Sequence, residues 1–129
     1  MVVSGNFINA DVSVFHEAGV RAEISNNKMR GFSGILVDGS TAGTPTHTLI
    51  RNNDIKISDS VDYYAVRIKE CSHSQVIGNR LQGYEGVSYN NTSTSAIHLG
   101  LQIADNYIYG CAKSITGVYD VGIAGAFFN

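Results

Sequence analysis

The chain has 129 residues, a formal net charge of −2 and 16% charged residues, which fits one small domain without a basic surface. It contains 12 Val and 13 Ile but only 5 Leu, together with 14 Gly, 11 Asn and one Pro. β-Branched side chains favour strands, and Gly and Asn favour tight turns, so this composition argues against helical bundles and coiled coils. The low positive charge argues against nucleic acid as a partner. No apolar run approaches the roughly 20 residues of a membrane span, so we expect no membrane insertion.

A six-residue pattern recurs five times along the chain, with an apolar residue at each end and Asn at its fourth position. The recurring residues are Asn6, Asn27, Asn53, Asn79 and Asn106, separated by 21, 26, 26 and 27 residues. The residue before each of them is Gly, Asn or Asp, types that tolerate a left-handed backbone. Each repeat is therefore predicted to contain a strand before the Asn, a corner at the Asn and a short strand after it.

A second similarity predicts a third strand in each repeat. Residues 29–35 align without a gap with residues 81–87, and both segments have Gly at their third and sixth positions. In chain order, the third strands are centred on Val14, Ile35, Val66, Val87 and Ile115. A more variable loop then leads back to the first strand of the next repeat.

These repeats predict a stacked all-β fold. One repeat is too small to bury its own apolar face, whereas stacked repeats bury their Val and Ile side chains in one column. Neighbouring repeats would pair as parallel strands, and Asn27, Asn53, Asn79 and Asn106 would form a structural ladder of side-chain amides. We predict a right-handed parallel β-helix solenoid of about five coils with this Asn ladder. It would be a single domain over residues 1–129, and a segment of a longer chain because neither end has a capping helix.

The Val/Ile-x-Asn-Asn-x-Ile pattern at this spacing resembles the right-handed parallel β-helices of the pectin-lyase-like superfamily over nearly the whole chain. The resemblance implies a fold that hosts pectate and pectin lyases, polygalacturonases, bacteriophage tailspikes and bacterial adhesins. In the enzymes of that superfamily the active cleft lies on the outer face of one sheet, which here would contain the third strands. The fold alone does not choose among these functions.

The outer face of the third strands offers few groups for catalysis. Because side chains alternate along a strand, the outward row is Phe15, Leu36, Arg67, Ser88 and Thr116, followed by Asp38, Lys69 and Asn90. Glycoside hydrolysis normally needs two carboxylates, and a calcium-dependent lyase needs several acidic oxygens, but this row contains only Asp38. Arg67-Ile68-Lys69 is similar to a polygalacturonase signature whose other motifs are absent. We therefore name no catalytic residue, and expect no metal, no other cofactor and no lyase or hydrolase activity from this segment alone.

The tyrosines suggest a binding site. Tyr63 and Tyr64 lie in the longest insertion, and Tyr84 lies in a loop between strands. Aromatic faces stack on sugar rings, while polar neighbours bind hydroxyl groups. The candidate carbohydrate-binding residues are Tyr63, Tyr64, Tyr84, Arg67 and Asp38. The other interpretation is that Tyr84, which aligns with Phe32, is a packing position of the repeat.

Two functions remain open. The first is a structural and receptor-recognition module of a phage tailspike or similar virion fibre, a homotrimer in the virion tail that engages cell-surface polysaccharide. The alternative is a fragment of a secreted or periplasmic pectate-lyase-like polysaccharide lyase or glycoside hydrolase. The first is favoured because the chain has only two Cys and no visible signal peptide. The identity of the saccharide stays open.

Overall fold

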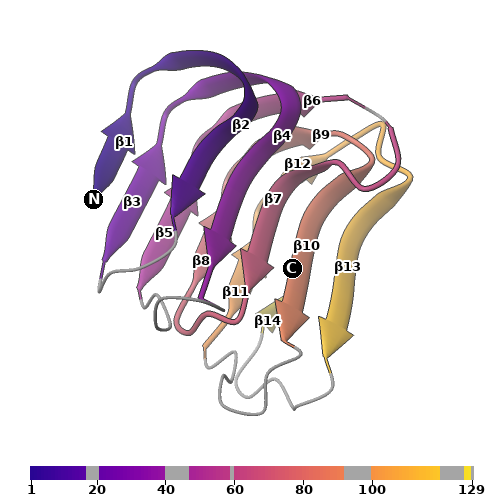
Figure 1. Ribbon diagram of the computed structural model, residues 1–129. Helices are drawn as coiled ribbons and strands as arrows, with labels where there is room; N and C mark the ends of the chain where they lie inside the picture. The colour runs from indigo at the N-terminus through magenta and orange to yellow at the C-terminus, as the bar shows by residue number, and fades with distance from the viewer. Residues whose placement is uncertain (17–20, 40–46, 59, 92–99, 120–126, 129) are drawn as a thin grey trace.

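The computed structural model describes residues 1–16, 21–39, 47–58, 60–91, 100–119 and 127–128, which contain fourteen β-strands and no helix (Figure 1). The strands form a six-stranded and an eight-stranded sheet. Each pairing between these strands is parallel. The predicted all-β class with parallel strands is therefore confirmed. Nothing in the described ranges forms a helix that could span a membrane.

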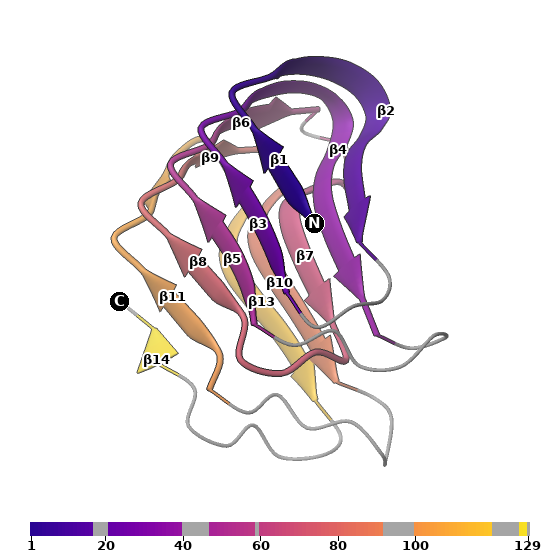
Figure 2. The same cartoon turned by 90° about the vertical axis from the view of Figure 1, so that its left-hand side faces the viewer.

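The six-stranded sheet contains the strand that precedes each recurring Asn. Its order is β1 (Val2–Ser4), β3 (Ala22–Ser25), β5 (Thr48–Arg51), β8 (Gln75–Ile77), β11 (Gln102–Ala104) and β14 (Phe127–Phe128). This is also the order along the chain, so each strand lies beside its equivalent in the next repeat (Figure 2). The registers align Val3, Ile24, Ile50, Val76 and Ile103, as the repeat pattern predicts.

The eight-stranded sheet contains the remaining strands of every repeat. They are β2 (Phe7–His16), β4 (Lys28–Asp38), β6 (Asp54–Ile57), β7 (Tyr64–Lys69), β9 (Arg80–Gln82), β10 (Glu85–Asn91), β12 (Tyr107–Ile108) and β13 (Lys113–Tyr119). The beginning of β4 pairs with β6 and its end pairs with β7. We call the part built from β6, β9, β12 and the beginnings of β2 and β4 the first half of this sheet. The second half contains β7, β10, β13 and the ends of β2 and β4. The first two repeats thus have one continuous strand where two strands were predicted.

Each recurring Asn follows a corner with a left-handed backbone. The preceding residues have φ values of 72° at Gly5, 57° at Asn26, 55° at Asn52, 65° at Gly78 and 56° at Asp105. Gly, Asn and Asp adopt this conformation at the lowest steric cost, which explains why only these types precede the Asn. The corner lets the chain leave the six-stranded sheet and enter the eight-stranded sheet at the same place in every repeat.

The structure joins the recurring Asn side chains in one row. Side-chain Nδ2 atoms donate to the Oδ1 atom of the next Asn at 3.1 Å from Asn27 to Asn53, 3.0 Å from Asn53 to Asn79 and 2.9 Å from Asn79 to Asn106. The backbone N–H group of each donor residue also donates to the same Oδ1 atom. Asn6 begins the row by donating to Asn27 at 3.1 Å. Because Asn27, Asn53 and Asn79 are buried, these bonds satisfy polar groups that water does not reach.

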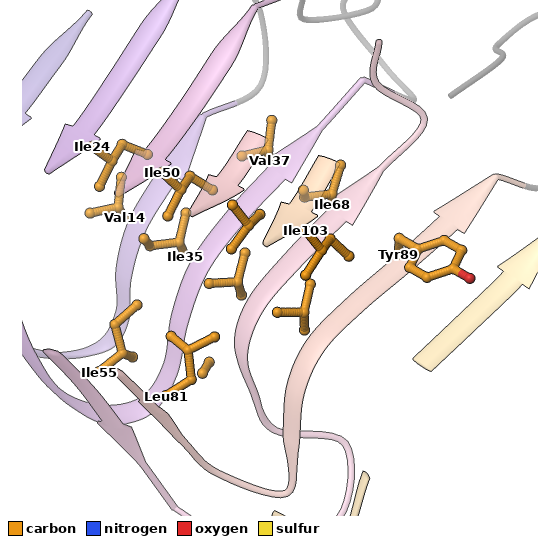
Figure 3. Packing of buried hydrophobic residues seen from close by; sticks show 14 of the residues in the cluster. Val14, Ile24, Ile35, Val37, Ile50, Ile55, Ile68, Leu81, Tyr89 and Ile103 are labelled. Carbon is orange, nitrogen blue, oxygen red and sulfur yellow. The ribbon is translucent and has the colours of Figure 1, made fainter. Parts of the chain in front are cut away.

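The hydrophobic core lies between the two sheets (Figure 3). The fully buried side chains include Ile24, Ile50, Val76 and Ile103 from the six-stranded sheet, Met29, Ile55 and Leu81 from the first half, and Ile35, Val66 and Val87 from the second half. The registers align the third-strand centres as predicted. Ile115 was predicted to be buried with them but is 40% exposed. Its strand, β13, is at an edge of the sheet and pairs only with β10, so no described strand covers its other side.

A closed solenoid is not identified among the described residues. The chain segment that leads from the second half back to the six-stranded sheet is fully described only between β7 and β8. In the other repeats this segment includes residues outside the described ranges, and parallel pairing alone determines neither the closure of a coil nor its hand. The structure therefore supports an all-β fold with parallel strands in two sheets.

Candidate functional site

A groove of about 390 Å³ lies on the outer face of the second half of the eight-stranded sheet. Its charged lining residues are Asp38, Arg67, Lys69, Glu85 and Lys113, and its smaller polar ones are Ser88, Asn90 and Thr116. The registers place Leu36, Arg67, Ser88 and Thr116 in one row across β4, β7, β10 and β13. The row predicted from side-chain alternation therefore exists, and Phe15 continues it on β2 with 52% of its surface exposed.

The second row of the groove contains an ion pair between neighbouring strands. Asp38 at the end of β4, Lys69 at the end of β7 and Asn90 on β10 are aligned. The Nζ atom of Lys69 lies 3.3 Å from Oδ2 of Asp38. The Asp38 side chain is only 16% exposed, so its carboxylate is held at a defined place by the partner strand.

Glu85 is a second carboxylate in the groove, and the sequence analysis missed it. Its Oε2 atom lies 3.2 Å from Nη2 of Arg67, and its Oε1 atom lies 3.8 Å from Nζ of Lys113. Strict alternation from Val87 would place Glu85 on the inner face, which is why the outward row did not include it. The signal that could have revealed it is the strand register, which sets Glu85 directly opposite Lys113. The predicted outward row contains Asp38 alone, but the groove includes Glu85 as a second carboxylate beside that row.

The predicted tyrosines do not line the groove. Tyr64 is buried, and the Arg67 guanidinium lies 4.1 Å from the centre of its ring. Burial raises the pKa of the Tyr64 hydroxyl, although the positive charge of Arg67 opposes this shift. Tyr63 contacts Phe32 at 5.5 Å between ring centres and packs against the core. The Lys113 ammonium lies 5.4 Å from the centre of the Tyr84 ring, so Tyr84 contacts a cation of the groove without lining it. Of the five candidate carbohydrate-binding residues, the structure thus brings only Arg67 and Asp38 together in the groove.

The charges of the groove form a paired network. Three cations, Arg67, Lys69 and Lys113, face two carboxylates, Asp38 and Glu85, and each ion pair joins residues of different strands. Cationic groups donate hydrogen bonds and carboxylates accept them, so the groove offers both kinds of partner within a small area. A ligand rich in hydroxyl groups, which both donate and accept, matches this arrangement.

The chemistry of other reactive groups in the described part of the chain is limited. No three His, Cys, Asp or Glu side chains there gather in a group that could hold a metal ion. Burial raises the pKa of the Cys71 thiol to about 12, so this thiol stays protonated near neutral pH. Burial also raises the pKa of the Cys111 thiol. Neither cysteine is therefore activated as a nucleophile.

The chain matches no family model, no curated protein and no solved structure. Its identification with the pectin-lyase-like superfamily, and with a tailspike or tail-fibre segment in particular, is therefore wrong. The Asn spacing on which that identification was based has a physical explanation that requires no common ancestor. When parallel strands stack in register, the same corner recurs in every repeat. The buried polar groups at that corner need hydrogen-bond partners, and an Asn amide can both donate and accept.

Proposed function

We propose that this chain is a structural and recognition module that binds a cell-surface polysaccharide in the groove over β4, β7, β10 and β13. The observation that carries this proposal is the network of Asp38, Arg67, Lys69, Glu85 and Lys113, which offers alternating donors and acceptors on four neighbouring strands. Sugar hydroxyl groups need both kinds of partner. The strands are held in register by their backbone bonds, so the binding groups are ordered before a ligand arrives.

Binding in this groove is expected to be of modest strength. Each charged group already has a partner on the protein, and a sugar hydroxyl must compete with that partner and with water. The aromatic residue in the groove lining, Tyr89, is only 9% exposed, and Tyr63 and Tyr64 are not part of that lining. Among the described lining residues, a sugar ring therefore meets no open aromatic face. Recognition of a repeating polymer by several copies of the module would compensate for a weak single contact.

The proposal includes an assembly. The repeats would stack as one solenoid of about five coils, and the parallel registers of equivalent strands support the stacking. The coil would be right-handed because nearly all crossovers between parallel strands are. Three copies would form a homotrimer in the tail of a virion, with exposed apolar side chains such as Val12, Phe15 and Phe32 covered between subunits. Light scattering tests the trimer, because a chain that remains monomeric at high concentration would contradict it. A crystal structure that traces residues 92–99 and 120–126 tests the solenoid.

The binding site is tested by titrating the protein with uncharged oligosaccharides prepared from bacterial capsules and lipopolysaccharide O-chains. Amide chemical shifts around residues 36–38, 67–69 and 88–90 should change and saturate. Asp38→Asn should weaken binding about tenfold, because a hydrogen bond to a charged acceptor is lost. Asp54→Asn is the matched control, since Asp54 is also a carboxylate paired with a cation of a neighbouring strand but lies outside the groove. Equal weakening in both variants, or no saturable change with any of these saccharides, would overturn the proposal.

A second candidate function is a secreted or periplasmic polysaccharide lyase or glycoside hydrolase. It is favoured by one observation, the presence of two carboxylates, Asp38 and Glu85, in the same groove. A reducing-end assay on capsular and pectic polysaccharides separates the two functions. Turnover that is abolished by Asp38→Asn or Glu85→Gln would establish the enzyme, whereas saturable binding without turnover would leave recognition as the function.

A further inference from the structure

A separate face of the protein concentrates positive charge. Four of the chain's nine Lys and Arg residues lie on the outer face of the first half of the eight-stranded sheet. The registers place them in two rows that run across the strands. One row is Phe7, Lys28, Asp54, Arg80 and Tyr107, and the other is Asn9, Arg30, Lys56 and Gln82. Between the rows, Met29, Ile55 and Leu81 point into the core, so alternation directs both rows outward.

The charge of these rows is opposite to that of the chain. Lys28, Arg30, Lys56 and Arg80 give +4 and Asp54 gives −1, so the rows carry +3 on a chain whose net charge is −2. Asp54 neutralises only Arg30, whose Nη2 atom lies 2.9 Å from its Oδ2 atom. Lys28, Lys56 and Arg80 are exposed, and no ion pair joins them to any carboxylate within the described ranges. This face differs in that respect from the groove, where every charge has a partner.

Aromatic rings lie at the end of the rows. Tyr107 is 64% exposed and stacks on Tyr109 at 5.2 Å between ring centres. The Arg80 guanidinium lies 4.9 Å from the centre of the Tyr109 ring, which holds the cation at the surface beside the two rings. Phe7, 68% exposed, occupies the other end of the first row. Flat apolar surfaces beside unpaired cations suit a ligand that combines ring faces with negative charge.

We propose that this face binds an anionic polysaccharide that runs across the strands from Phe7 toward Tyr107. Equivalent side chains of neighbouring strands are about 4.8 Å apart, and the two rows are about 7 Å apart along the strands. The charged strip is therefore long and narrow, which fits one extended saccharide chain better than a nucleic acid duplex. The low overall charge of the protein also disfavours tight binding of nucleic acid at physiological salt. This site is separate from the groove and does not depend on the function proposed for it.

The test uses dextran sulfate as the probe and uncharged dextran as its control, by calorimetry at low and moderate salt. Dextran sulfate should bind, and its affinity should fall as salt rises because exposed charges are screened. Lys28→Gln combined with Lys56→Gln should weaken binding at least tenfold. Arg21→Gln combined with Arg51→Gln removes the same charge from exposed positions at the six-stranded sheet and should change affinity less than threefold. Tyr107→Ser should weaken binding without changing the charge.

A second measurement keeps the proposal testable if a variant folds poorly. In the unmodified protein, amide shifts caused by dextran sulfate should cluster at residues 28–30, 54–56, 80–82 and 107–109. Equal weakening by the two double variants, equal binding of uncharged dextran, or shifts confined to other strands would overturn the proposal. Tighter binding of single-stranded DNA than of dextran sulfate would also overturn it.

Discussion

At the scale of single residues, the buried Asn side chains are the most constrained groups of the molecule. Asn53 accepts hydrogen bonds from both nitrogens of Asn27 and donates to Asn79, and its Nδ2 atom also donates to the Ile24 carbonyl at 2.9 Å. No other side chain of similar size offers both an acceptor and two donors in this shape. This explains why Asn, rather than another turn-forming residue, recurs at the corner.

Replacing Asn53 with Ala should therefore lower the free energy of unfolding by about 2–4 kcal/mol, since several buried polar groups lose their partners. Asn53→Asp should be at least as harmful near neutral pH, because it removes the donors and buries a charge. The control is Asn6→Ala at the exposed start of the row, which should cost less than about 1 kcal/mol. Urea unfolding measures all three. Similar losses for Asn53→Ala and Asn6→Ala would show that the row contributes little to stability.

His16 makes the stability of the fold dependent on pH. It is 5% exposed, and its Nε2 atom has no hydrogen-bond partner within the described residues. Burial lowers the pKa of His16 below its ordinary value of 6.5, and the nearby amino terminus adds to this shift. The folded state therefore binds fewer protons than the unfolded state at mildly acidic pH. Stability should be fully present above about pH 6.5 and should fall as the pH drops below that value.

The measurement is urea unfolding at pH 7.5, 6.0 and 5.0 for the protein and for His16→Leu. The variant should lose less stability on acidification, because it has no imidazole to protonate at this position. The other three histidines, His47, His73 and His98, are present in both proteins and so cancel in the comparison. Identical losses in the two proteins would assign the pH dependence to other groups.

At the scale of elements, a row of small residues brings the strands of the second half close to their neighbours. The residues immediately before the aligned strand centres are Ser13, Gly34, Ala65, Gly86 and Ser114. A Cβ atom on Gly34 would lie 2.1 Å from the Ala65 carbonyl oxygen, and one on Gly86 would lie 2.5 Å from the Ser114 carbonyl oxygen. The Gly residues that align in the sequence of the second and fourth repeats therefore reflect close backbone approach.

Gly34→Ala should destabilise the protein by about 1–3 kcal/mol, because the backbone of β4 or β7 must move to admit the methyl group. Gly83→Ala is the matched control from the same aligned segment. A Cβ atom there would meet its nearest neighbour at 3.4 Å and requires no displacement of a carbonyl group. Thermal unfolding should separate the two variants, and equal midpoints would contradict the close approach.

The apolar rows of the two sheets predict that an Ala substitution costs more stability at a buried position than at an exposed one. Val76 and Ile103 are fully buried, so replacing either with Ala should cost about 1–4 kcal/mol through lost burial and the cavity that remains. Ile115→Ala, at the exposed edge, should cost less than about 1 kcal/mol. Denaturant unfolding of the three variants gives the comparison. A loss below 0.5 kcal/mol at Val76 would be inconsistent with its position in the core.

At the scale of the whole molecule, the first strands of both sheets present free edges within the described residues. β1 pairs only with β3, and β2 pairs only with β4. Val12 and Phe15 are exposed on the ten residues of β2. A long apolar edge is a template for pairing with another chain.

We expect the isolated chain to associate in a concentration-dependent way through this edge. Val12→Lys should reduce that association, because a buried charge between paired strands is costly. Val61→Lys is the control, because it places the same charge on another exposed Val away from the edge. Sedimentation velocity at several concentrations should show a smaller average mass for Val12→Lys alone. An equal effect of both substitutions would indicate that general solubility, not the edge, controls association.

The sequence by itself determined the features that repeat. The positions of the strands before each Asn, the left-handed residue at each corner and the alignment of Val14, Ile35, Val66, Val87 and Ile115 all follow from local chemistry at a regular spacing. A preference for strand or turn depends on the residue and its neighbours, and repetition makes a weak preference visible five times. The sequence pattern did not determine ancestry, because unrelated chains that stack parallel strands meet the same requirements.

Only the tertiary structure decided which side chains share a surface. Glu85 meets Arg67 and Lys113 through the register of β7, β10 and β13, and Ile115 is exposed because β13 lies at an edge. Lys56 and Arg80 lie in later repeats than Lys28 and Arg30, and the four become one charged face only through the register of β4, β6 and β9. Side-chain interactions of this kind depend on distances between strands of different repeats. No local preference encodes those distances; packing of the two sheets around a common core sets them.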